Sequence, residues 1–286
     1  MISPQRIARQ SGRIVAGLLA GVISSWSYIE PLSAMVQLPA GFIRWTIPAL
    51  AIAYAIWRMR PRTHLELRGP NNLRVHLSFG DVFTQKNTDT GLAIPTDDFF
   101  LTKNKKFVTP GMLISQLKQK RFNNSDDFDT KVLEATEPLR DHFDFEARDF
   151  PKELEGRTRQ WPLGSTAVLQ VDGTYYFFTA SCKIDLQSSP PSGRATPPEL
   201  FKALLGLWQA ITKHPSGKPV VVPLFGAGQT GTGLRPTEAL HIMLVSLVCA
   251  ARATPISDEI RIVIHDSHQK HIDLDDDVLK GIMHAE

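Results

Sequence analysis

The sequence predicts an α/β domain preceded by two apolar segments. Three observations lead to this prediction. A valine-rich strand at residues 220–225 runs into a glycine loop and then a helix, further strand-like runs lie before and after it, and residues 1–62 contain two long stretches with almost no charge. A strand, loop and helix in succession are typical of α/β folds. Uncharged stretches of nearly 20 residues are candidates for membrane helices.

The stretch Val220–Pro236, VVVPLFGAGQTGTGLRP, carries the clearest pattern. Within eight positions it has four glycines, namely Gly226, Gly228, Gly231 and Gly233. Glycine permits positive φ, so the loop can turn several backbone N–H groups inward. The N-terminus of the helix that Pro236 begins would add partial positive charge. We therefore predict a phosphate-binding loop, and the alternative is a flexible surface turn.

Two common phosphate loops do not fit this stretch. Gly226, Gly228 and Gly231 match GxGxxG, but a dinucleotide-binding fold uses that motif after its first strand and needs several βα units afterwards. Here only one strand, Glu259–His265, can follow. A Walker loop fails because no Lys-Ser or Lys-Thr pair closes the glycine run.

Charge divides the 286-residue chain unevenly. Residues 1–62 hold seven arginines, no lysine and one acidic residue, for a net charge of +6. Because the whole chain is +3, residues 63–286 sum to −3, and we expect no nucleic-acid partner for them. Cys182 and Cys249 lack metal-type spacing, and we interpret both as buried thiols in a reducing compartment.

The two apolar stretches of residues 1–62 predict a transmembrane hairpin. Ile14–Ile29 is free of charge, and Leu38–Trp57 is interrupted only by Arg44. Arginines precede the first stretch and follow the second, so the positive-inside rule places both ends, and the following domain, on the cytoplasmic side of the inner membrane. The alternative for the first stretch is a cleaved signal peptide, which would leave the second unexplained.

Small residues recur at every fourth position of the first apolar stretch. Gly17 and Gly21 form GxxxG, and Ser25 continues the pattern. Such a stripe lets helices approach closely in lipid and favours self-assembly. The alternative is that small residues are simply common in membrane helices.

Two segments resemble ligand-binding elements of macro domains. The strand Leu73–Phe79 ends in Gly80-Asp81-Val82-Phe83, similar to the element that places an aspartate against the adenine amino group. The glycine loop resembles the loop that cradles the diphosphate of ADP-ribose. The stretch Thr96-Asp97-Asp98 takes the place of the asparagine-bearing loop of hydrolytic macro domains, but it lacks the asparagines that position a catalytic water.

The order of these elements resembles the macro-domain effector of type II Thoeris anti-phage defence. The resemblance implies a three-layer α/β/α macro domain with a mixed sheet at residues 63–286, after the two-helix transmembrane hairpin of residues 1–62. It implies no catalytic residue and no cofactor or metal. The ligand would be an ADP-ribose conjugate, with histidine as the attached group in the characterised type, made by a TIR-domain, NAD-consuming partner. Binding would cause homo-oligomerisation, disruption of the lipid bilayer and abortive infection.

Under this resemblance the ligand-binding residues come from five segments. They are Asp81, Val82 and Phe83; Thr96, Asp97 and Asp98; Gly111 and Met112; Phe225, Gly226, Ala227, Gly228, Gln229, Thr230, Gly231, Thr232 and Gly233; and His265 and Asp266. Two other functions stay open. One is a membrane-tethered ADP-ribosyl hydrolase, and the other is a constitutive membrane scaffold whose α/β domain binds only protein.

The remaining elements follow from periodicity. Strands are expected at 65–67, 73–79, 166–171, 175–180 and 259–265, and helices at 198–211, 237–251 and from Asp273. Residues 107–120 predict a loop around Gly111 and a short helix. Residues 123–160 are charged and lack a clear period, so we expect a helical and loop insertion on the surface. His142 and His214 are expected to be structural.

Overall fold

Eight strands pair into one mixed β-sheet in the computed structural model, which describes Ala49, Tyr54 and residues 62–84, 90–103, 108–142, 159–185, 192–214, 218–228 and 231–284. The strands are β1 His64–Arg68, β2 Arg74–Phe79, β3 Gly91–Asp97, β4 Thr166–Val171, β5 Thr174–Asp185, β6 Ser192–Arg194, β7 Val220–Pro223 and β8 Glu259–Ile264. Their order in the sheet is β1-β2-β8-β7-β3-β5-β4, with β6 paired to β5.

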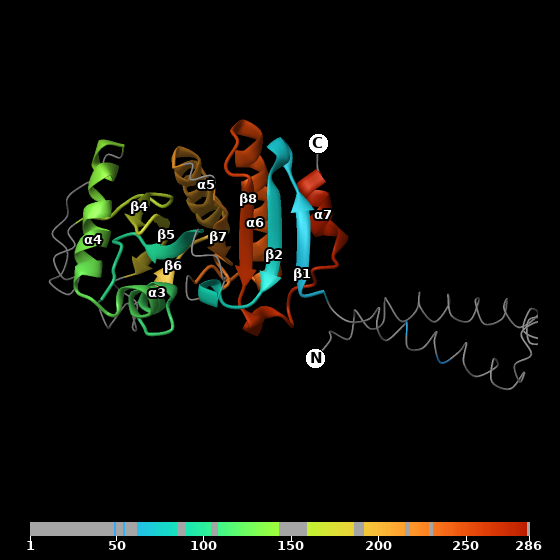
Figure 1. The fold of residues 1–286 in the computed structure, drawn as a ribbon, viewed down its shortest axis with the longest axis horizontal. Coiled ribbons are helices and arrows are strands. Elements are labelled where there is room, and N and C mark those ends of the chain that lie inside the picture. The colour runs from blue at the N-terminus through green and yellow to red at the C-terminus, as the bar shows by residue number, and fades with distance from the viewer. Residues whose placement is uncertain are drawn as a thin grey trace, which may run out of the picture. The chain divides into compact units, whose positions relative to one another are not determined.

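The central five strands, β2, β8, β7, β3 and β5, all run parallel. By contrast β1, β4 and β6 are antiparallel to their neighbours. The carboxyl ends of the five parallel strands therefore share one edge of the sheet, at the lower side of Figure 1. In open α/β sheets this edge is where ligands bind.

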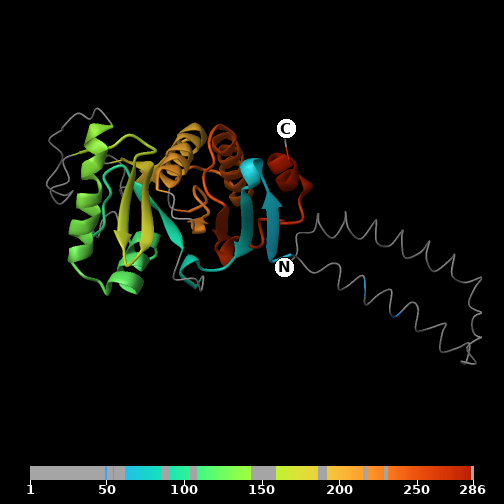
Figure 2. The same ribbon diagram turned by 45° about the horizontal axis from the view of Figure 1, so that its top comes forward.

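Helices cover both faces of the sheet (Figures 1 and 2). One face packs against α5 Pro197–Lys213, α6 Pro236–Ala253 and α7 Asp277–His284, and the other packs against α3 Leu113–Phe122 and α4 Asp127–Ala135. Short 3-10 turns lie at Pro70–Asn72, Val82–Thr84, Glu137–Asp141 and Asp266–His268. This layering agrees with the predicted α/β class.

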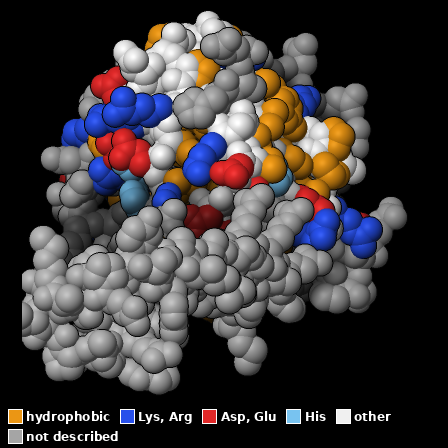
Figure 3. Space-filling model, turned by 90° about the vertical axis from the view of Figure 1, so that its right-hand side faces the viewer, with side chains coloured by type: hydrophobic (Ala, Val, Ile, Leu, Met, Phe, Trp, Pro, Cys, Tyr) orange, Lys and Arg blue, Asp and Glu red, His pale blue; other side chains and the backbone are white. Residues whose placement is uncertain are grey.

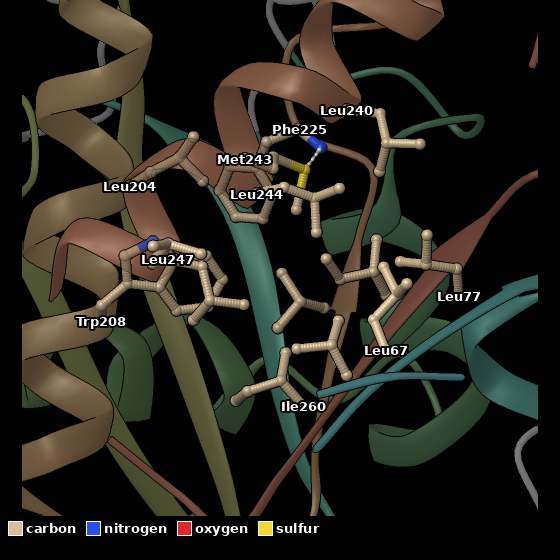
Figure 4. Close-up of a cluster of buried hydrophobic side chains, with 14 of the residues drawn as sticks. Leu67, Leu77, Leu204, Trp208, Phe225, Leu240, Met243, Leu244, Leu247 and Ile260 are labelled. Atoms are coloured by element: carbon tan, nitrogen blue, oxygen red, sulfur yellow. Dashed lines mark hydrogen bonds between the residues drawn. The ribbon is translucent and has the colours of Figure 1, made fainter. Parts of the chain in front are cut away.

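The valine run explains why β7 lies at the centre. Val220 and Val222 belong to the hydrophobic cluster under α5 and α6, whereas Val221 belongs to the cluster under α3 and α4. Successive side chains of a strand point to opposite faces, so a strand covered on both faces is apolar throughout. Figure 4 shows the first cluster, in which Trp208 of α5 and Leu247 of α6 lie close to each other.

The structure extends or corrects several predicted elements. β5 continues from the expected end at Ala180 to Asp185. Within the expected surface insertion, α4 is amphipathic and fully buries Phe128 and Val132, so this part belongs to the core. Cys182 is buried as predicted, but Cys249 on α6 is exposed, so that prediction was wrong.

The predicted membrane hairpin lies outside the described residues, apart from Ala49 and Tyr54. The chain divides into two units, residues 1–62 and 63–286, and nearly all described residues belong to the second. Among the described helices, α6 alone is long and apolar enough to cross a membrane, with a mean hydropathy of 1.2 over 18 residues. Eight of its residues are buried in the domain, so core packing explains its composition.

Acidic and basic side chains are interspersed on the face of the domain shown in Figure 3. The described part of that face therefore presents no continuous basic surface of the kind that binds nucleic acid.

Candidate functional site

A cavity of about 610 Å³ opens at the carboxyl ends of the parallel strands. Its walls come from the residues that end β2, β3, β5, β7 and β8, together with the loop before α3 and the first turn of α3. The volume is within the usual range for a small-molecule site. Ten of the predicted site residues line it: Asp81, Val82, Thr96, Asp97, Gly111, Met112, Phe225, Gly226, Gly228 and His265.

Asp81 lies at one end of the cavity and is already paired. Its Oδ1 accepts the N–H of Phe83 at 2.9 Å, and its Oδ2 lies 2.8 Å from Nζ of Lys120, which also stands 4.6 Å from the centre of the Phe83 ring. Partial burial would raise the pKa of Asp81, but the hydrogen bonds from Lys120 and Phe83 outweigh it and hold the pKa below its usual value. Asp81 is therefore a carboxylate balanced by a cation.

Asp97 lines the cavity at the end of β3 without a cationic partner among the described residues. Its Oδ1 accepts the N–H of Phe99 at 2.8 Å and the N–H of Leu101 at 3.2 Å. Burial raises the pKa of Asp97 to about 7, and the neighbouring Asp98 acts in the same direction. The turn that it holds is strained, because Phe100 has φ 54°.

Asp98 is fully buried and does not line the cavity. Its Oδ1 accepts the N–H of Ile184 at 3.0 Å, and its Oδ2 accepts Nε2 of Gln160 at 2.6 Å. The carboxylate therefore joins the end of β3 to β5 and to the segment before Trp161, whose N–H donates to the Asp98 carbonyl at 2.8 Å. This geometry gives Asp98 a structural role.

The glycine loop contributes backbone to the cavity only in its first half. Phe225, Gly226 and Gly228 line it, and the N–H groups of Gly226, Ala227 and Gly228 make no hydrogen bond within the described ranges. Gly226 has φ +81°, and a Cβ there would approach Cδ2 of Leu200 to 2.5 Å. Glycine is therefore required at 226 by both conformation and space.

The second half of the glycine loop closes on itself and packs away from the cavity. Thr232 donates its hydroxyl to the Gly226 carbonyl at 2.6 Å, and a Cβ at Gly231 would approach the Gly193 carbonyl oxygen to 2.4 Å. Gly231, Thr232 and Gly233 do not line the cavity. Gln229 and Thr230 lie outside the described residues.

The helix N-terminus that faces the cavity belongs to α3, not to α6 as the sequence suggested. Met112, Leu113 and Ile114 line the cavity, the Met112 side chain makes no capping bond, and the first turn of α3 has no acidic residue. At the N-terminus of α6 the carboxylate of Glu238 instead accepts hydrogen bonds from the N–H of Arg235 at 2.8 Å and from its guanidinium at 2.6 Å, and none of the first-turn residues of α6 lines the cavity. The partial positive charge available to an anion therefore comes from α3.

His265 lines the cavity after β8, beside β7 as the prediction of parallel strands required. Its Nδ1 accepts the N–H of Ser267 at 3.2 Å, which places the ring proton of the neutral form on Nε2. The other predicted residues do not line the cavity: Phe83 lies against Lys120, Ala227 is half-buried, and Asp266 is exposed.

Sequence reasoning missed the walls that come from the extended β5 and from β6. The signal for the β5 extension was available, because Ala180, Cys182 and Ile184 continue the apolar alternation after the expected strand end. β6 has only three residues and no such pattern. The lining residues that were not predicted are Gly80, Pro95, Leu101, Val108, Thr109, Leu113, Ile114, Gln116, Ser181, Cys182, Ile184, Ser192, Gly193, Pro223, Leu224, Val263 and His268.

Reactive groups are scarce on the cavity wall. Cys182 is buried, and burial followed by the nearby Asp97 raises the pKa of its thiol, so it stays protonated near neutrality. In the described part of the chain, no three His, Cys, Asp or Glu side chains gather into a potential metal site. The arrangement favours a site that holds a ligand through backbone N–H groups and a few polar side chains.

The protein has a mixed sheet with helices on both faces, and a cavity lies at the edge formed by the carboxyl ends of the parallel strands. These features define its class as an α/β ligand-binding domain. Residues 75–265 match the family model described as "Thoeris protein ThsA, Macro domain". The match covers well over half of the chain, so this chain belongs to that family. The matched range contains all of the described lining residues except Ser267 and His268.

Solved structures with a similar fold include two of the Oceanobacillus iheyensis macrodomain. One, with MES bound, is 13% identical and is matched over 72% of this chain and 90% of that chain, with a TM-score of 0.43. The other, described as the macrodomain with ADP, has the same identity, coverage and TM-score. A search of curated proteins found no match. The assignment of this chain therefore rests on the family match.

Proposed function

We propose that this chain is a membrane-anchored sensor and effector of anti-phage defence whose macro domain binds an ADP-ribose-derived signal. The signal would be made by a TIR-domain partner that consumes NAD, and histidine-conjugated ADP-ribose is the leading candidate. The observation that carries the proposal is the cavity itself. Gly226, Gly228 and the first turn of α3 line it, in a chain of the Thoeris macro-domain family.

The described wall of the cavity has no lysine or arginine. A nucleoside diphosphate would therefore be held there by backbone N–H donors. A diphosphate can be held by several backbone N–H groups and a helix N-terminus, as in other phosphate sites. Asp81, three strands away from Asp97 in the sheet, would accept the adenine amino group. To bind adenine, the Asp81 carboxylate would either share its oxygens between adenine and Lys120 or lose its ion pair with Lys120.

We infer that the domain binds its ligand without hydrolysing it. Asp97 uses one oxygen to hold a turn, Asp98 is buried in structural hydrogen bonds, and Cys182 is a protonated thiol. Of these groups only Asp97, with a pKa of about 7, could serve as a general base, and the 96–98 loop lacks the asparagines that position a catalytic water in hydrolytic macro domains. A turnover assay on ADP-ribosylated protein tests this inference, and steady product release would support the hydrolase instead.

Signalling would require the ligand to favour an assembled state. A ligand shifts an equilibrium only by its differential affinity for the two states, so oligomers must bind the signal more tightly than the free chain. The apolar stretches of residues 1–62, with their small-residue stripe, are the segments proposed to associate in the inner membrane and disrupt it.

The test uses the full chain purified in detergent. Calorimetry would compare ADP-ribose, histidine-conjugated ADP-ribose and NAD, and light scattering would follow the oligomer size at saturation. We expect binding of the ADP-ribose compounds and a larger assembly with the conjugate. Absence of binding would refute the sensor, whereas binding without a change in size would leave a receptor that does not assemble.

A further inference from the structure

The two acidic side chains of the cavity differ in how their charge is balanced. Asp81 at the end of β2 is paired with Lys120 at 2.8 Å. Asp97 at the end of β3 has no ion pair among the described residues, and its Oδ1 accepts the N–H groups of Phe99 and Leu101. No lysine or arginine lies among the described lining residues, so no described cation on the wall balances Asp97.

The sheet places these two carboxyl groups at opposite ends of the cavity. Between β2 and β3 lie β8 and β7, so the ends of the two strands are three strand spacings apart, roughly 14 Å. The glycine loop after β7 lies between them. If the diphosphate of the proposed ligand sits at that loop and its adenine near Asp81, the part beyond the diphosphate reaches Asp97.

We propose that Asp97 determines specificity for the part of the ligand beyond the diphosphate, and that it selects a group that donates a hydrogen bond or carries positive charge over one that carries negative charge. This inference rests on the proposed function. A partly buried carboxylate that faces a second anion without a cation is strongly disfavoured, whereas an ammonium group or a hydroxyl can bond to it directly.

The local structure keeps Asp97 in place for this role. Its Oδ1 holds the turn in which the buried Phe100 has φ 54°, so the side chain cannot rotate away without releasing two backbone N–H groups. The backbone N–H of Asp97 itself also bonds to the carboxylate. The titratable groups beside it are Asp98 and the protonated thiol of Cys182, which carry no positive charge, and His265 and His268 line the cavity at the end of β8.

The experiment compares two ligands that differ only in the charge of their end group. Both are ADP-ribose joined at the distal anomeric carbon to an imidazole, in one case that of histamine and in the other that of imidazolepropionic acid. Calorimetry on the full chain in detergent at pH 8 would measure both, with ADP-ribose as reference. We expect the amine conjugate to bind about tenfold or more tightly than the acid conjugate.

The variant Asp97→Asn removes the charge and keeps an oxygen that can accept both backbone N–H groups. We expect it to reduce the preference for the amine to less than about threefold, whatever its effect on the affinity for ADP-ribose, whose ribose hydroxyls can also bond to Asp97. The matched control is Asp81→Asn at the other end of the cavity, which should weaken all three ligands equally. An unchanged preference in Asp97→Asn, or no preference in the wild type, would overturn the inference.

A second measurement covers the case in which Asp97→Asn does not fold. Because the pKa of Asp97 is about 7, the wild-type preference for the amine should be larger at pH 8 than at pH 6, by about threefold or more. The imidazole is common to both conjugates, so its titration cancels in the ratio. A ratio independent of pH would refute the role of Asp97. Failure of all three ligands to bind would instead refute the proposed function.

Discussion

The N-termini of α3 and α6 show how two similar helix starts come to have different roles. α6 follows the glycine loop and was the expected anion site, yet its first turn carries the carboxylate of Glu238 and does not line the cavity. α3 begins at Leu113 after Met112, its first turn has no acidic residue, and that turn lines the cavity. A helix N-terminus attracts an anion only where its N–H groups are open to it, so proximity in sequence to a glycine loop is a poor guide.

The largest expected effect is at Gly228, in the loop that joins β7 to α6. A Cβ at this position meets nothing within 4 Å, so Gly228→Glu should fold normally. Its carboxylate would enter the cavity and repel a diphosphate, and we expect the affinity for ADP-ribose to fall roughly 100-fold or more. Gly228→Ala is the matched control and should bind within about fivefold of the wild type. Normal binding by Gly228→Glu would exclude this half of the loop from the site.

A direct comparison of the two helices places one negative charge on each. Gln116→Glu adds a charge in the first turn and a half of α3, on the cavity wall, and Thr237→Glu adds one to the first turn of α6. Because the diphosphate would lie at α3, we expect Gln116→Glu to weaken ADP-ribose binding about 5- to 20-fold and Thr237→Glu to change it less than about twofold. The reverse order, measured by calorimetry, would restore α6 as the anion site.

A third test concerns Asp97, which shares the cavity with α3. Its pKa is raised to about 7 from 3.8, so between these pH values the folded state binds more protons than the unfolded state, and stability falls as pH rises. Asp97→Asn removes this loss. The melting temperature of Asp97→Asn minus that of the wild type should therefore increase by roughly 3–6 °C from pH 5 to pH 8.

The difference in melting temperature between the wild type and Asp97→Asn reports on the Asp97 carboxyl group alone. His214 and His268 have pKa values lowered by burial, and they raise stability with pH equally in both proteins. A difference in melting temperature that stays constant with pH would show that the pKa of Asp97 is near its ordinary value.

The smallest effect is expected from removing the α6 cap. Glu238→Ala should lower the melting temperature by about 2–4 °C at pH 7 and leave ADP-ribose binding unchanged. The hydrogen bond from Arg235 lowers the pKa of Glu238, so its stabilisation is present above the ordinary pKa of 4.5 and is lost as pH falls. A loss of affinity in this variant would connect α6 to the site after all.

Much of the fold was predictable because its elements have local signals. The valine run and the helices around Trp208 and Leu240 were predicted within a few residues of their observed bounds. The β5 extension and the burial of α4 were missed because alternation weakens at a strand end and because a charged helix can still bury one face. Roughly half of the predicted site residues line the cavity, and these belong to segments that end parallel strands.

The sequence by itself determined which segments form strands and helices, where glycine permits positive φ, and to which family the chain belongs, because periodicity, composition and motif order are written along the chain. Only the tertiary structure decided that α3 rather than α6 faces the cavity, that Asp97 lines it while Asp98 is buried, and that Lys120 balances Asp81. These outcomes depend on which strand ends meet at one edge of the sheet. That pairing joins residues far apart in sequence, so no local pattern encodes it.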